Sequence, residues 1–266
     1  MEFIKYHIAG KSYIFIPDED NFEKLTKTDI INLCHNEKGA GADGIFTCNK
    51  NSLKIGHLRG FDKNGNIMRD FSSASICAVF EPFSFTHASE WSFLSDSEHK
   101  ITVKTAFRED YRIFSCLIET PESEGIFREI RRKTEIGNRI LTITPVNLHS
   151  ICAVHFSECR EKLDIRYLGQ HISDNSLFRK EANLIIAEKT SPCSFDISFY
   201  ENKSACPRPT LSAFAATALA ACKNGICRYG EEIAVACGIN IVTVICHCSE
   251  AVSVECTCQK VFLGLI

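Results

Sequence analysis

Short runs of alternating apolar and polar residues recur along the whole chain, and they constrain its fold more than any other feature. A period of two places the apolar side chains on one face of a β-strand. Such runs lie at residues 3–7, 12–16, 44–48, 54–61, 100–105, 113–119, 139–144, 152–156, 183–188, 196–201, 239–246 and 252–258. The sequence therefore predicts a protein rich in strands.

A few segments have helical character instead. Residues 72–80 follow a polar loop, and residues 211–222 end in Lys223-Asn224-Gly225, a favourable helix stop. Residues 21–34 follow three acidic residues and carry apolar side chains at helical spacing, which predicts one further helix.

The two main helices are preceded by matching acids. Asp62 lies nine residues before Phe71, where the first helix opens, and Glu201 lies nine residues before Thr210, where the second opens. This repeat predicts two similar lobes. The N-terminus of each helix would present unpaired N–H groups and partial positive charge, which attract a carboxylate or a phosphate.

Composition excludes several classes of function. With 30 basic and 33 acidic residues the net charge is −3, and the basic run at 128–133 is interpreted as a solvated connector, so nucleic-acid binding is not expected. No apolar run reaches eighteen residues, and the first residues lack a signal peptide's apolar core. We expect a cytoplasmic protein that binds no membrane, as a monomer or homodimer.

The chain has 15 cysteines, an odd number that does not suit a disulfide scaffold. They are interpreted mostly as reduced, buried apolar residues. Cys246 with Cys248 and Cys256 with Cys258 form two CxC pairs. A register that pairs Cys246 with Val254 would place all four on one face, but the CxC spacing is weakly specific, so no metal is predicted.

Several segments, in order, resemble the diaminopimelate epimerase family of lysine biosynthesis. The closest local match is KGAGADGIF at 38–46, which is similar to the family's glycine-rich loop. Other matching segments are 1–16, 61–71, 146–156, 168–188, 198–210 and 260–266. The resemblance implies an α+β fold of two pseudo-symmetric lobes, each an antiparallel barrel-like sheet around a central helix. Residues 1–118 with 259–266 would form one lobe and residues 119–258 the other.

The resemblance also implies a cofactor-free reaction. In the family one cysteine thiolate removes the α-proton of an amino acid, a second cysteine returns a proton, and the two helix starts hold the carboxylate. Carried onto this sequence, the two cysteine positions are Phe71 and Thr210. Phenylalanine cannot accept a proton, and a threonine hydroxyl is a far weaker acid than a thiol. The sequence therefore predicts loss of the two-cysteine reaction.

Other positions separate into departures from the family and matches to it. Lys11 and Asp62 stand where the family has asparagine, and Asn202 stands where it has arginine. Asn147, His149, Asn183 and Glu201 match the family. The expected binding residues for a small carboxylate or phosphorylated ligand between the lobes are Lys11, Asp62, Ser72, Ser73, Asn147, Asn183, Glu201, Thr210, Leu211 and Ser212.

Alternative interpretations remain open at this level. The hydroxyl residues at the helix starts are good capping residues and could do no more than cap. The chain could be a divergent isomerase or dehydratase that uses Thr210 or an acid such as Asp43, although Asp43 and Asp62 also suit loop and turn roles. It could also be a non-catalytic partner of an active paralogue.

Overall fold

The computed structural model describes residues 1–50, 55–80, 89–95, 100–108, 111–119, 125–178, 181–201 and 208–266. The chain divides into two units, residues 1–117 with 256–266 and residues 118–255. None of the helices in the described part combines the length and apolar character needed to cross a membrane.

Unit 1 is a sheet in which the last strand of the chain pairs with the first. Its strand order is β16-β1-β2-β3-β4-β5-β6-β7. The strands are β1 (Glu2–Ile8), β2 (Lys11–Phe15), β3 (Gly44–Lys50), β4 (Ile55–Asp62), β5 (Glu90–Ser95), β6 (Lys100–Arg108), β7 (Tyr111–Glu119) and β16 (Cys258–Leu265), with helices α1 (Glu19–Glu23), α2 (Lys27–Cys34) and α3 (Ser72–Phe80).

In unit 2 the strands follow the order β15-β14-β13-β12-β11-β10-β9-β8. Its strands are β8 (Arg132–Ile136), β9 (Arg139–Asn147), β10 (Ile151–Ser157), β11 (Asn183–Ser191), β12 (Ser194–Tyr200), β13 (Glu232–Cys237), β14 (Asn240–Cys246) and β15 (Ala251–Cys256). Its helices are α4 (Ile165–Ser173) and α5 (Leu211–Lys223), with short 3-10 turns at Gly125–Arg128, Arg160–Lys162 and Ser176–Phe178.

The two units repeat one pattern of strand directions. From β16 to β6 the successive pairs are antiparallel, antiparallel, parallel, antiparallel, parallel and antiparallel. From β8 to β14 the pairs follow the same series. In both units a helix connects the equivalent parallel strands: α3 joins β4 to β5, and α5 joins β12 to β13. The predicted α+β class with duplicated architecture is confirmed.

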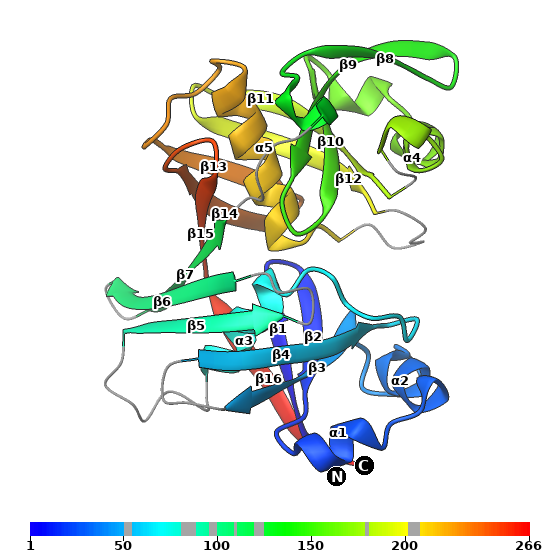
Figure 1. Cartoon of the computed structure of the whole chain (residues 1–266), viewed down its shortest axis with the longest axis vertical. Coiled ribbons are helices and arrows are strands. Elements are labelled where there is room, and N and C mark those ends of the chain that lie inside the picture. Colours follow the sequence, from blue (N-terminus) through cyan, green and yellow to red (C-terminus); the bar gives the residue numbers. More distant parts are fainter. Residues whose placement is uncertain are drawn as a thin grey trace. The chain divides into compact units, whose positions relative to one another are not determined.

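Each unit has one buried helix against a curved sheet (Figure 1). Helix α3 packs on β1, β2 and β3 and also on β6 and β16, while α5 packs on β9, β10 and β11 and also on β13 and β14. A helix reaches strands that lie so far apart in the strand order only because the sheet curls around it. Helix α5 accordingly buries every residue from Leu211 to Cys222.

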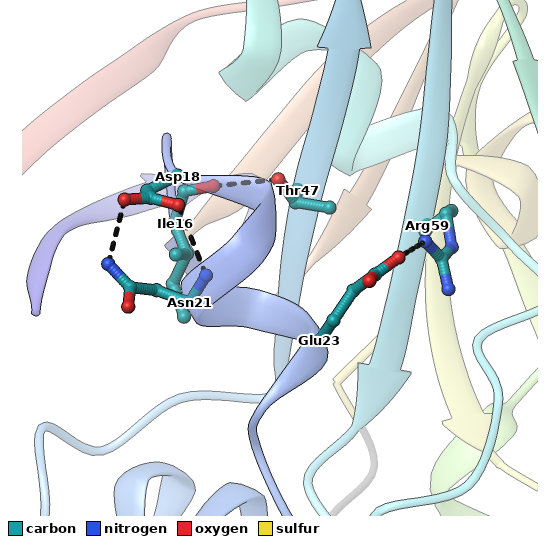
Figure 2. Close-up of polar contacts among 6 residues, drawn as sticks. All are labelled: Ile16, Asp18, Asn21, Glu23, Thr47 and Arg59. Atoms are coloured by element: carbon teal, nitrogen blue, oxygen red, sulfur yellow. Dashed lines mark hydrogen bonds and ion pairs between the residues drawn. The ribbon is translucent and has the colours of Figure 1, made fainter.

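A second layer of helices covers the outside of each sheet. In unit 1 the carboxylate of Asp18 caps α1, and Glu23 of α1 accepts a 2.8 Å ion pair from Arg59 on β4 (Figure 2). Beside the start of this helix, the hydroxyl of Thr47 on β3 donates to the carbonyl of Ile16 at 2.8 Å. In unit 2, Leu168 and Ile172 of α4 join an apolar cluster with residues of β9, β10 and β11.

Several local predictions were wrong. The helix expected at 21–34 is two helices, because Thr26 and Asp29 form a reciprocal capping box that starts α2. Part of the basic connector at 128–133 belongs to β8, and the expected pairing of Cys246 with Val254 is shifted by two, since Cys246 lies opposite Val252. Strands β5, β8 and β13 and helix α4 were not predicted from alternation or helical spacing.

Candidate functional site

The site residues predicted in unit 1 gather at one end of its sheet. Lys11 begins β2, Asp62 ends β4, and Asp43 immediately precedes β3 between them. The register places Tyr13 opposite Gly44 and Gly44 opposite Asp62, so these three strand ends are adjacent. Lys11 is only 6% exposed, which keeps a cationic side chain within this end of the unit.

The two acids in this group hold the backbone. The carboxylate of Asp43 accepts the N–H of Ser12 at 2.9 Å and so ties the glycine-rich loop to β2. Asp62 accepts the N–H groups of Asn64 and Asn66 at 2.9 and 2.8 Å, and its other oxygen accepts the side-chain amide of Asn66. Both carboxylates therefore stabilise a loop and a turn by accepting backbone N–H groups, as their sequence context suggested.

The start of α3 carries a carboxylate from the chain itself. Phe71, at the first cysteine position, is fully buried, and its carbonyl accepts the N–H of Ser75 at 2.8 Å. Asp70 accepts the N–H of Ser72 at 3.0 Å and the hydroxyl of Ser72 at 2.6 Å. Asp70 thus satisfies the helix N-terminus where a ligand anion was expected, with Ser72 and the buried Ser73 in the first turn.

Unit 2 brings its predicted residues to the equivalent end of its own sheet. Asn147 ends β9, Asn183 begins β11 opposite Cys152 of β10, and Glu201 directly follows β12. His149, 5% exposed, lies in the turn between β9 and β10. Since β12 is the topological counterpart of β4, Glu201 corresponds to Asp62, as the repeated sequence spacing predicted.

The start of α5 differs from that of α3. Thr210 is its N-cap, and the hydroxyl accepts the N–H of Ala213 at 3.3 Å. Leu211 and Ser212 are fully buried in the first turn. Among the residues that the structure describes, the hydroxyl of Ser212 has no hydrogen-bond partner. A buried hydroxyl without a partner is costly, so it marks a place where a ligand oxygen would be stabilised.

The thiols that contact α3 are poorly suited to act as bases. Cys116 of β7 lies 3.7 Å from the carbonyl oxygen of Ser72, and burial raises the pKa of this thiol to about 12. Burial likewise raises the pKa of Cys77, inside α3, well above its ordinary value. A protonated thiol is neither a nucleophile nor a base, so neither group replaces the missing thiolate at neutral pH.

Asn202, one of the departures from the family, lies outside the described residues. Within the described ranges, no group of three histidine, cysteine, aspartate or glutamate side chains is placed so that it could hold a metal ion. The four cysteines of the CxC pairs do not act together: Cys246 contacts Cys222 of α5, and Cys258 contacts Cys77 of α3.

Comparison of the structure with solved proteins identifies the architecture. A phenazine biosynthesis protein of the PhzF family from Bacillus anthracis matches with a TM-score of 0.64 at 12% identity, over 100% of this chain and 99% of the other. A predicted epimerase from Pseudomonas aeruginosa matches with a TM-score of 0.67 at 10% identity, over 100% and 98% of the two chains. The chain has the fold of the PhzF and epimerase-like proteins.

A further neighbour with this epimerase-like fold is a hydroxyproline epimerase from Agrobacterium vitis, solved with bound trans-4-hydroxy-L-proline. Its TM-score is 0.63 at 9% identity, with 99% of this chain and 90% of that chain covered. No protein-family model matches the sequence, and no curated protein matches it. At such low identities the likeness establishes the epimerase-like fold, and the chemistry has to be argued from the residues.

The sequence predicted most of the residues at the two sheet ends but did not predict Asp70. Its signal was present, because an acid two residues before a predicted helix is well placed to bond the first N–H groups. The comparison with the family drew attention to position 71 instead.

Proposed function

We propose that this chain is an epimerase-like protein that has lost two-cysteine amino-acid epimerisation and binds a small carboxylate or phosphate at the start of α5. The observation that carries the first part is the identity of the residues at the two helix starts. Phe71 is buried and apolar, and Thr210 uses its hydroxyl to cap α5. Each general acid or base contributes typically about 10² to 10⁴ to a rate, so loss of both removes the reaction.

The binding part of the proposal rests on the difference between the two helix starts. Asp70 already bonds the first turn of α3, whereas the first turn of α5 holds the buried, unpartnered hydroxyl of Ser212. The α5 dipole favours an anion there, and the hydroxyl supplies a donor. A carboxylate or phosphate oxygen satisfies both. Diaminopimelate and similar zwitterionic amino acids are less suited, because Lys11 and Asp62 stand where the diaminopimelate epimerase family has asparagine.

Solvent deuterium exchange tests the lost activity. Purified protein is incubated in D₂O with diaminopimelate or with trans-4-hydroxy-L-proline, and NMR follows loss of the α-proton signal. We expect no exchange above a heat-denatured control. Exchange that disappears in a Thr210→Val variant would show that the threonine serves as a base and would contradict the proposal.

Thermal shift with inorganic phosphate and small dicarboxylates tests binding. We expect a rise in Tm for the wild type that is lost in Ser212→Ala. Ser72→Ala is the matched control, because Ser72 occupies the first turn of α3 and its hydroxyl already donates to Asp70. An equal loss in both variants, or no shift with any anion in the wild type, would argue against a site at α5 and favour a non-catalytic interaction protein.

A second candidate function is an isomerase that works with one carboxylate, and Asp70 favours it. This acid stands next to the first cysteine position, at the N-terminus of α3, whereas Asp43 lies in the glycine-rich loop and ties that loop to β2. If an assay detects proton exchange on any small carboxylic acid, Asp70→Asn should abolish it and Asp43→Asn should mainly lower stability. Exchange that survives Asp70→Asn would exclude this candidate.

A further inference from the structure

A thiol pair joins the buried helix of unit 1 to the last strand of the chain. Cys77 lies within α3 and is completely buried, and Cys258 is the first residue of β16 and is partly exposed. Their sulfur atoms are 3.9 Å apart. Helix α3 and β16 also pack against each other beyond this contact, so the two sulfurs are held near each other by the fold.

Other described thiols also contact each other, and the pair of Cys193 and Cys227 likewise has one partly exposed and one buried member. Cys222 and Cys246 also contact each other, but they are only 6% and 0% exposed. Cys116 is completely buried and its sulfur faces the hydroxyl of Ser75 and the carbonyl of Ser72. Cys248 is exposed. A reagent in solution therefore meets Cys258 and Cys193 as partly exposed members of pairs and Cys248 as an exposed thiol. The pair of Cys77 and Cys258 is the one that links α3 to the last strand of the chain.

We propose that Cys77 and Cys258 form an oxidation site, at which a peroxide converts the two thiols into a disulfide that ties α3 to β16. A disulfide needs a sulfur separation of about 2.0 Å, so side-chain rotation must close a gap of about 1.9 Å. The alternative of a metal site is not supported, because no third ligand joins the two sulfurs among the described residues.

The order of the chemical steps follows from burial. Burial and the neighbouring Cys258 keep the pKa of the Cys77 thiol high, so Cys77 stays protonated and cannot attack first. The thiolate of Cys258 attacks one peroxide oxygen, the O–O bond breaks, and hydroxide leaves with the electron pair. Cys258 is then a sulfenic acid. The hydroxyl oxygen of the sulfenic acid takes the proton of Cys77 as the sulfur of Cys77 attacks the sulfur of Cys258, the S–O bond breaks, and water leaves.

The link would close a loop across most of the chain, since Cys77 and Cys258 are 181 positions apart. A cross-link of this length restricts the unfolded chain strongly. Oxidised protein should therefore unfold at a temperature several degrees higher than the reduced protein, and dithiothreitol should reverse the change.

Peptide mapping of the full chain tests the proposal. The native protein is treated with hydrogen peroxide, alkylated, and digested without reduction by trypsin together with a glutamate-specific protease. Since the bond from Glu81 to Pro82 resists cleavage, Cys77 then lies in peptide 70–90, and Cys258 lies in peptide 256–260, which also holds Cys256. We expect a linked pair of these peptides, two hydrogens lighter than their sum. Cys258→Ser should abolish it, while Cys256→Ser and Cys248→Ser should retain it.

The exposed Cys248 is the internal control, because its oxidation shows that the peroxide has reacted with the protein. If Cys248 is oxidised while Cys77 and Cys258 both remain alkylatable, the proposal is overturned. It is also overturned if Cys258 stops at sulfinic acid, if it links to Cys256, or if Cys222 links to Cys246 first. Cys77→Ser is the complementary variant, and Cys258→Ser decides the outcome if that buried substitution prevents folding.

Discussion

At the scale of single residues, the two buried helices start in chemically different ways although the surrounding strands repeat. Asp70 gives α3 its own internal anion, and Ser72 adds a second bond to the same oxygen. Helix α5 begins with a neutral cap and leaves the hydroxyl of Ser212 unpaired among the described residues. The duplicated architecture has therefore kept its scaffold while the residues at its two helix starts became unequal.

Ala9 offers a test of local backbone strain. It occupies the β1–β2 turn with φ of 46°, followed by Gly10 with φ of 90°. Two positive φ angles suit an Asn-Gly turn, and alanine at the first position is strained. Ala9→Asn should raise the free energy of unfolding by roughly 0.5 to 1 kcal/mol, measured by urea denaturation. Ala9→Val should lower it, and a stabilising valine would contradict this account.

At the scale of elements, the sequence predicted most of the strands, including β2, which is buried at all five residues, but it missed β5 and β13, whose burial alternates. It also predicted α3 and α5, which have clear helix starts. Strand β5 and helix α4 were not predicted, because some of the residues that stabilise them are distant in sequence. Helix α4 mixes charged and apolar residues, and its buried side depends on Tyr200 and on the apolar cluster of unit 2.

The same limit applies to the candidate site. Its residues were found from acid-to-helix spacing and from family resemblance, whereas the bonds of Asp43, Asp62 and Asp70 depend on how loops meet strand ends. The sequence shows which residues can accept a hydrogen bond from a backbone N–H group. Only the folded chain shows which N–H group each of them accepts.

Gly169 tests how far packing overrides helix propensity. A Cβ at this position in α4 would lie 2.1 Å from Cγ of Tyr200, although alanine is the better helix former. We expect Gly169→Ala to lower the free energy of unfolding by about 1 to 3 kcal/mol, because the ring must move within a packed core. Gln170→Ala, at the exposed neighbouring position, is the control and should change stability little. Equal urea midpoints for the two variants would contradict this expectation.

At the scale of the whole molecule, buried thiols predict how stability depends on alkaline pH. Burial raises the pKa of Cys34 and of Cys116 from 9.0 to about 12. Below pH 9 both thiols are protonated in folded and unfolded chains, so their contribution to stability is complete. Between pH 9 and 12 they ionise only in the unfolded chain, and stability falls.

Urea midpoints measured with reductant at pH 8, 9.5 and 10.5 should therefore decline. Cys116→Ala removes one such group, so its midpoint should be lower at pH 8 but should fall less steeply as pH rises. A variant with the wild-type slope would show that other groups control the alkaline transition.

The pairing of β16 with β1 has a consequence for how the nascent chain acquires its shape. Unit 2 is one continuous segment, whereas unit 1 needs residues 256–266 to complete its sheet. Because the ribosome makes the chain in order, β1 must wait for its outer partner until all of residues 118–255 have been synthesised. During that interval the apolar face of α3 that later meets β16 is uncovered. This face, together with the unpaired edge of β1, is where a holding chaperone would act.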